Sequence, residues 1–160
     1  MTQSNPANRD PLSDAPGAHP VGTGIGAAGG AVTGAAGRMG QRIICLTEET
    51  VETLYLLGQE DRIVGVTGYA IRPARVRREK PRVGAFTSAD IPKIMELRPD
   101  LVLTFSDLQA PIVADLIREG VEVHAFNQRD VAGILQMIRT CGALCGVADR
   151  AEALAQGYRD

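Results

Sequence analysis

The sequence predicts an α/β fold, in which a mostly parallel sheet is flanked by helices and follows a disordered Gly/Ala-rich N-terminal extension. From Arg42 onward, short runs rich in Ile and Val alternate with segments of helical periodicity, the order of elements that produces right-handed βαβ units. The run LVLTF at 101–105 has no polar residue before Thr104, as expected of a strand buried on both faces. Up to about Gly40 the chain is mainly Gly, Ala, Pro and polar residues, which bury too little surface to offset the entropy of ordering.

These observations divide the chain into three parts. Residues 1–41 are expected to form a flexible Gly/Ala/Pro-rich leader, and residues 42–148 an α/β lobe. Residues 149–160 begin a further helix. The boundary near Gly40 is the point where the composition changes.

The first half of the lobe is expected to contain two strands, one helix and a loop. RIICLT at 42–47 predicts a strand, and the helix that follows at 48–57 ends where Gly58 can adopt the C′ conformation. RIVGVT at 62–67 predicts the second strand. The arginine-rich stretch at 72–82 contains Pro73 and Pro81 and is expected to be a solvated loop.

The second half of the lobe repeats the alternation. A brief extended piece at 82–85 leads to a helix with Asp90 as its N-cap and Pro92 in its first turn. The remaining elements are the strand 101–105, a helix at 110–119 that Gly120 ends, a strand at 121–126 and a helix at 130–144 with an apolar side.

Composition and charge exclude several functions. A formal net charge of −2 gives no electrostatic footprint for nucleic acid or an anionic membrane. The uncharged stretch 20–37 is too short and too weakly apolar to span a bilayer, and no signal peptide is visible. We interpret Cys45, Cys141 and Cys145 as small buried hydrophobes, and the two histidines have no nearby metal-ligand partners. No metal site and no nucleic-acid partner are expected.

A glycine motif in the leader has the spacing of a phosphate loop. Gly24, Gly26 and Gly29 form G-x-G-x-x-G, but the prolines before them prevent the strand that such a loop requires. We therefore expect no dinucleotide cofactor.

Aromatic residues gather where the predicted strands end. Of the six aromatics, Tyr69, Phe86, Phe105 and Phe126 each follow or end a strand or extended piece. Ligands of parallel sheets bind beyond the carboxyl ends of the strands, so these side chains predict a flat apolar surface for a large ligand. The alternative is that they cap the core beneath the loops.

Polar residues in the same loops could orient a ligand. They include Thr47 and Glu48 at the end of the strand at 42–47, and Ser106 and Asp107 after the strand at 101–105. Several are equally suited to capping helices, Ser106 or Asp107 before one helix and Thr47 before another. No nucleophile, base and orienting acid can be assembled from these loops, so the sequence indicates binding without catalysis and no catalytic residues.

Three stretches of the lobe, taken together, resemble the substrate-binding proteins of ABC importers for cobalamin and ferric siderophores, and most of all the cobalamin-binding branch. The stretches are RIICLTEETVETLYLLGQEDRIVGVTGYAIRP, PRVGAFTSADIPKIMELRPDLVLTF and LIREGVEVHAFNQRDVAGILQMIRTCGALCG. The most distinctive motif is L-x-P-D-L-V at 97–102, and the match extends from about Arg42 to Ala155.

The resemblance implies one lobe of a two-lobed receptor that holds its ligand between the lobes. Residues 149–160 would then begin the helix that joins the lobes, and the chain would supply half of the cleft. Tyr69, Phe86 and Phe105 fall at positions where aromatic residues of the family pack against the corrin. The implied ligand is cobalamin or a related corrinoid; a ferric siderophore or haem, or a non-binding fragment with an interaction role, stay open.

The resemblance also implies an ABC importer permease as partner, and contact with the membrane only through that transporter. The glutamate with which the family docks falls at Pro92, so Asp90 and Glu96 are the candidates nearby. A periplasmic location is implied, although without a visible signal peptide a cytoplasmic one stays open. Residues 1–40 separately resemble the start of a bacterial glycine-zipper protein.

Overall fold

The computed structural model describes residues 39–160. The predictions for the leader, namely its disorder, its glycine-zipper resemblance and its G-x-G-x-x-G motif, lie outside the described residues.

Four strands form one sheet, in the order β2-β1-β3-β4. Its centre is β1 (Ile43–Cys45), which pairs with β2 (Ile63–Val66) on one side and β3 (Leu101–Phe105) on the other, and β4 (Val123–Phe126) pairs with β3. All three pairings are parallel, which confirms the predicted α/β class. The carboxyl ends of the strands therefore meet at one edge.

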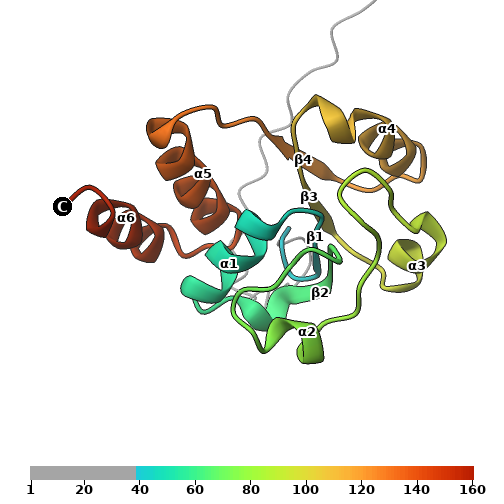
Figure 1. The fold of residues 1–160 in the computed structure, drawn as a ribbon, viewed down its shortest axis with the longest axis horizontal. Coiled ribbons are helices and arrows are strands. Elements are labelled where there is room, and N and C mark those ends of the chain that lie inside the picture. Colours follow the sequence, from blue (N-terminus) through green and yellow to red (C-terminus); the bar gives the residue numbers. More distant parts are fainter. Residues whose placement is uncertain (1–38) are drawn as a thin grey trace, which may run out of the picture. The chain divides into compact units, whose positions relative to one another are not determined.

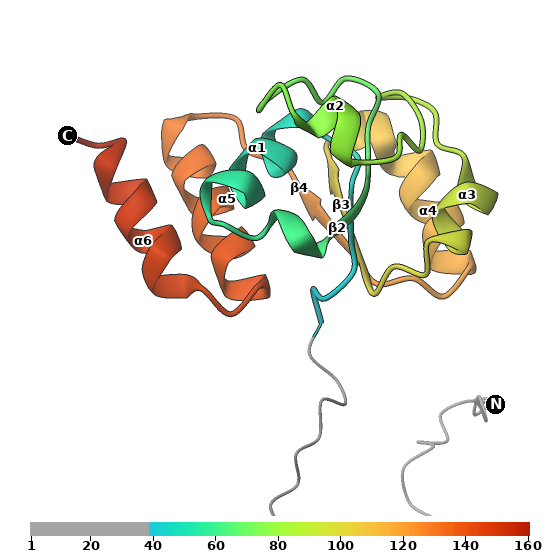
Figure 2. The same ribbon diagram turned by 90° about the horizontal axis from the view of Figure 1, so that it is seen from below.

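Helices cover both faces of the sheet (Figures 1 and 2). One face carries α1 (Glu48–Leu56), α5 (Val131–Leu144) and α6 (Ala148–Gly157), and the other carries α3 (Ile91–Glu96) and α4 (Ala110–Arg118). Within residues 39–160, none of the helices has the length and apolar character that a membrane crossing needs.

Strand β3 shows how this sandwich follows from the sequence. Leu101 and Leu103 pack into the core beneath α1 and α5, while Val102 packs into the core on the opposite face. Because alternate side chains of a strand point to opposite faces, an unbroken apolar run satisfies both cores at once.

The predicted helix boundaries are largely confirmed. Asp90 caps α3 by accepting a hydrogen bond from the Lys93 amide at 3.1 Å, and a proline lies in the first turn. Gly58 and Gly120 have φ angles of 69° and 82°, a left-handed conformation that glycine adopts without strain. Helix α6 begins at Ala148, next to the predicted start of the last segment, and packs against α5.

Three local predictions were wrong. The extended piece at 82–85 forms only isolated bridges, Val66 with Arg82 and Gly84 with Ala89, and adds no strand to the sheet. The arginine-rich stretch is not all loop, since it contains the one-turn helix α2 (Val76–Glu79). That turn is held from outside, because the Tyr55 hydroxyl donates to the Glu79 carboxylate at 2.7 Å.

Thr47 is the third exception. It stands at the N-cap position of α1, but its side chain makes no capping hydrogen bond. Its hydroxyl instead lies 3.0 Å from the Thr50 hydroxyl, in a buried pair. The Thr47 hydroxyl is therefore engaged with another side chain and does not cap the helix.

Replacing Thr104 by valine is expected to stabilise the protein. The Thr104 hydroxyl is fully buried in β3 and has no hydrogen-bond partner. Valine has nearly the same shape without the unpaired polar atom, so the free energy of unfolding should rise by about 1 kcal/mol. Urea denaturation of both proteins measures the difference, and a loss of stability would show that the hydroxyl has a partner.

Candidate ligand-binding site

The carboxyl edge of the sheet brings several predicted site residues into one pocket of about 280 Å³. Thr47 lies just after β1, and Glu48 is the first residue of α1. Tyr69 comes from the loop after β2, and Phe86 comes from the loop that precedes α3. Glu49 and Thr67 complete the lining. The pocket combines two aromatic rings with hydroxyls and carboxylates, a lining suited to orienting an apolar ligand.

Tyr69 is the most accessible aromatic residue of this pocket. Its side chain is 61% exposed, whereas Phe86 is half-buried. The Tyr69 amide lies 3.4 Å from the Thr67 hydroxyl, and the next residue, Ala70, is buried in the core. A buried neighbour on the chain thus anchors a ring that itself faces solvent.

Phe105, Ser106 and Asp107 form a separate group at the end of β3. They do not line the pocket. The Arg129 guanidinium stacks 5.8 Å from the centre of the Phe105 ring and 3.7 Å from an Asp107 carboxylate oxygen. The Ser106 hydroxyl accepts a hydrogen bond from the Leu108 amide, so Ser106 caps the 3-10 turn that precedes α4, whereas α4 itself has no side-chain cap.

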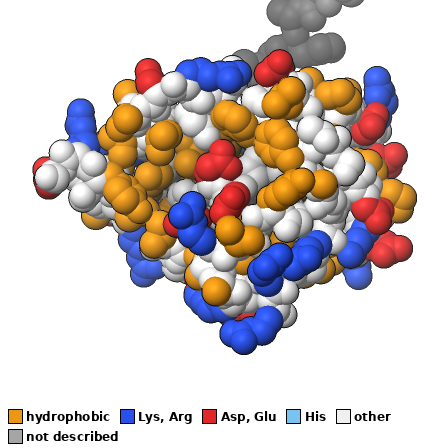
Figure 3. All heavy atoms as spheres, in the orientation of Figure 1, with side chains coloured by type: hydrophobic (Ala, Val, Ile, Leu, Met, Phe, Trp, Pro, Cys, Tyr) orange, Lys and Arg blue, Asp and Glu red, His pale blue; other side chains and the backbone are white. Residues whose placement is uncertain are grey.

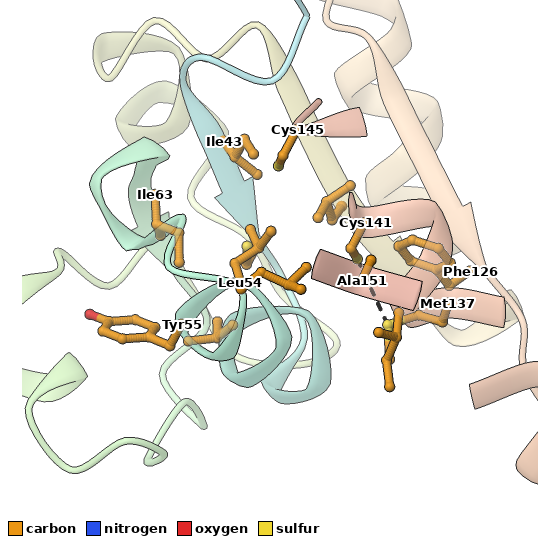
Figure 4. Packing of buried hydrophobic residues seen from close by; sticks show 14 of the residues in the cluster. Ile43, Leu54, Tyr55, Ile63, Phe126, Met137, Cys141, Cys145 and Ala151 are labelled. Carbon is orange, nitrogen blue, oxygen red and sulfur yellow. Dashed lines mark hydrogen bonds between the residues drawn. The ribbon is translucent and has the colours of Figure 1, made fainter. Parts of the chain in front are cut away.

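Phe126 lies away from the pocket and inside the core. Its side chain is only 7% exposed, and it packs with Met137 and Cys141 of α5 (Figure 4). The His124 ring stacks on it with centroids 4.4 Å apart. For this residue the structure favours the alternative interpretation, an aromatic that fills the core beneath the loops.

A larger groove of about 440 Å³ lies beside the pocket, between α1 and α5. Leu56, Val131, Ile134 and Tyr158 contribute apolar surface to it, and all are exposed. In Figure 3 apolar side chains gather over α5 and α6, next to this groove. The Nε atom of Arg72 lies 3.3 Å from a carboxylate oxygen of Glu52 and 3.7 Å from one of Glu48. These ion pairs join the rim of the groove to the loop after β2.

Two residues that matter for this edge carried no signal in the sequence. Gln109 is fully buried, and its side chain makes hydrogen bonds to two loops and to the end of β3. Arg72 was expected only to belong to a solvated loop. Nothing in the local pattern separates Gln109 from any other glutamine near a helix start. Its role depends on which loops the fold brings together.

Burial and ion pairs determine the charge states near the site. Burial raises the pKa of the Cys45 thiol to about 12, so Cys45 is a neutral thiol at physiological pH. Burial also lowers the pKa of His124. Hydrogen bonds from Arg75 and from Tyr55 lower the pKa values of Glu60 and Glu79, respectively. All three cysteines are buried and free, as predicted.

No metal centre is found among residues 39–160, where no three His, Cys, Asp or Glu side chains converge. Charged side chains near the pocket form ion pairs, as Arg72 does with Glu48 and Glu52. The pocket offers a ligand apolar surface and hydrogen-bonding groups.

A parallel sheet with one exposed and one half-buried aromatic ring in a pocket at its carboxyl edge is an architecture suited to binding a solute. The chain belongs to the periplasmic binding protein family, whose model matches residues 43–160. Members of this family bind solutes for ABC transporters and take them as cargo, not as cofactors.

Relatives of this chain bind different ligands. A cobalamin-binding protein of Halobacterium salinarum is 26% identical over 122 residues, which cover 75% of this chain and 33% of that protein. The crystal structure of a periplasmic haem-binding protein from Pseudomonas aeruginosa is 26% identical with a TM-score of 0.69, over 74% of this chain and 43% of that one. The periplasmic vitamin B12-binding protein of Vibrio cholerae shares the fold, at 24% identity and a TM-score of 0.68, over 74% and 47% of the two chains.

The structural neighbours are two-lobed periplasmic binding proteins. The chain spans less than half the length of these relatives.

Proposed function

We propose that this chain is the N-terminal lobe of a substrate-binding component of an ABC importer, and that its carboxyl edge binds cobalamin or a related corrinoid without catalysis. The observation that carries the proposal is the pocket that Tyr69 and Phe86 line together with Thr47 and Glu48. Flat aromatic rings match the face of a macrocycle, and the cobalamin-binding relative supports a corrinoid.

The size of the site sets the expected affinity. The pocket of about 280 Å³ is small beside a corrinoid, so one lobe would cover only one face of the ligand. A partly buried ligand gains little binding free energy beyond the entropic cost of association, so we expect a Kd on the order of 10–100 µM.

Calorimetric titration with cyanocobalamin tests the proposal. Saturable heat in this range would support it, and its absence up to about 1 mM, well above the expected Kd, would remove the ligand assignment. Parallel titrations with ferric haem and a ferric siderophore distinguish the ligand classes, and binding of none of the three would leave the non-binding interaction role.

A haem or ferric siderophore is the second candidate ligand. Arg129 stacks on Phe105 at the same edge of the sheet, so a cation and an aromatic face lie together, as an anionic macrocycle would require. The haem-binding structure from Pseudomonas aeruginosa supports this alternative. Under it, Arg129→Gln should weaken binding of haem and leave that of cyanocobalamin unchanged.

Replacing Tyr69 by serine is expected to weaken ligand binding by about tenfold, because an aromatic contact with a large ligand contributes on the order of 1–2 kcal/mol. Tyr158→Ser is the matched control, since Tyr158 is exposed to 59% against 61% for Tyr69 but lies outside this pocket. Calorimetry on both variants measures the difference. Equal affinities would remove Tyr69 from the site.

Docking to a permease is proposed through Asp90 and Glu96. Both are exposed and lie at opposite ends of α3, away from the pocket. Asp90 already accepts the Lys93 amide, and its second carboxylate oxygen is available to a basic residue of a partner. A periplasmic location accompanies this proposal, as it does for the family.

A further inference from the structure

The side chain of Gln109 occupies an unusual place in the candidate site. Gln109 lies in the 3-10 turn η2 (Asp107–Gln109) between β3 and α4, and none of its surface is exposed. Polar side chains are rarely buried so completely unless their hydrogen bonds are satisfied.

All three hydrogen bonds of this side chain go to backbone atoms, two of them in loops and one at the end of β3. Its Nε2 donates to the Leu46 carbonyl at 3.0 Å and to the Phe86 carbonyl at 2.8 Å. Its Oε1 accepts from the Phe105 amide at 2.9 Å. One side chain therefore joins the end of β1, the loop that carries Phe86 and the end of β3.

Glutamine is suited to this position by its chemistry. Two donors and one acceptor are needed at one point, which excludes an ionised glutamate because it cannot donate and a lysine because it cannot accept. Replacing the amide would leave buried backbone groups without partners, a loss greater than that of an average hydrogen bond.

The turn itself is closed without this side chain. The Ser106 hydroxyl accepts from the Leu108 amide at 3.3 Å, and the Gln109 amide donates to the Ser106 carbonyl at 3.3 Å. The carboxamide of Gln109 is therefore not needed to close the turn, and its hydrogen bonds go to the neighbouring segments.

We propose that Gln109 is the positioning residue of the ligand-binding edge, holding the Phe86 loop against the end of β3 so that the aromatic surface exists before a ligand arrives. The inference rests on the proposed function for its ligand, but the cross-link itself can be measured without one. A preformed surface binds more tightly because less ordering remains for the ligand to induce.

Gln59 provides a matched control within the same chain. It is also buried, with an exposure of 8%, and its Nε2 faces the Leu57 and Gly58 carbonyls at 3.3 and 3.0 Å. Its Oε1 accepts from the Arg62 guanidinium at 2.7 Å. These bonds lie just before β2, at the edge of the sheet opposite the pocket.

The test compares Gln109→Met and Gln59→Met in the full chain. Amide hydrogen exchange without ligand should become about tenfold faster at Phe105 in Gln109→Met only, since the hydrogen bond that protects this amide is lost. Affinity for cyanocobalamin and for ferric haem should fall about tenfold in Gln109→Met and stay unchanged in Gln59→Met.

Each outcome decides the proposal. Unchanged exchange and affinity in Gln109→Met would overturn it, as would equal losses of affinity in both variants, which would reveal general destabilisation. If the wild-type chain binds neither probe, the proposed function fails for this chain, while the exchange of the Phe105 amide alone still decides whether Gln109 holds the edge.

A second variant keeps the test decisive if Gln109→Met does not fold. Gln109→Glu retains shape and the acceptor for the Phe105 amide, but an ionised carboxylate would face two carbonyls. Protonation returns one donor, so its affinity relative to wild type should rise as the pH falls from about 8 to about 5. Wild-type affinity across that range would overturn the proposal.

Discussion

Replacing Phe126 by alanine is expected to lower the free energy of unfolding by about 3–5 kcal/mol, the usual cost of removing a buried aromatic ring. Phe126 ends β4 and packs into the core with Met137 and Cys141 of α5, as Figure 4 shows. Its exposure of 7% leaves little of the ring for a ligand. Alanine at this position would leave a cavity between the sheet and α5, and urea denaturation measures the cost.

Phe126→Leu separates a core role from a ligand role. Leucine retains most of the apolar volume, so this variant should stay folded and bind ligand as the wild type does. A folded Phe126→Leu variant that has lost its affinity would instead make Phe126 a ligand contact. A cost below about 1 kcal/mol for Phe126→Ala would contradict its place in the core.

Replacing Gly142 by valine is expected to cost about 3 kcal/mol or more, because helices α5 and α6 approach each other too closely for a side chain there. A Cβ atom on Gly142 would overlap the Ala151 Cβ and lie 3.2 Å from the Val147 carbonyl oxygen. Neither obstacle is a flexible side chain, so α6 would have to move. Ala151 and Ala155 of α6 are fully buried and would lose their packing.

Gly157→Val is the control for this prediction. Gly157 is the last residue of α6, and a Cβ there would meet nothing within 4 Å. The same substitution should therefore change stability by less than about 0.5 kcal/mol. Faster amide exchange throughout α6 in Gly142→Val would identify the detached helix, and equal stability of the two variants would refute the close approach.

The elements that sequence reasoning predicted well are those with a local physical cause. The apolar run at 101–105 became a strand buried on both faces, and Asp90 capped its helix. Gly58 and Gly120 took the left-handed conformation that ends a helix. In each case the residue and its immediate neighbours supply the whole explanation.

The candidate site was predicted only in part, for a corresponding reason. Tyr69 and Phe86 lie in one pocket: Tyr69 follows β2, and Phe86 follows the short piece at 82–85 that bridges to β2 through Arg82 and Val66. Phe105 and Phe126 satisfied the same sequence criterion, yet one stacks on Arg129 and the other is buried. Position after a strand determines the edge of the sheet on which a residue lies, but not whether its side chain faces outward.

The sequence by itself determined the fold class, the order of the elements and the edge of the sheet at which the candidate site residues lie, because periodicity and helix-ending residues act locally. The tertiary structure decided which aromatic rings reach the pocket and gave Gln109 and Gly142 their importance. Gln109 contacts Leu46 and Phe86, which lie 63 and 23 residues away along the chain, and Gly142 matters only because α6 packs against it. Interactions of this kind depend on segments that meet only in the folded chain, so no local sequence pattern predicts them.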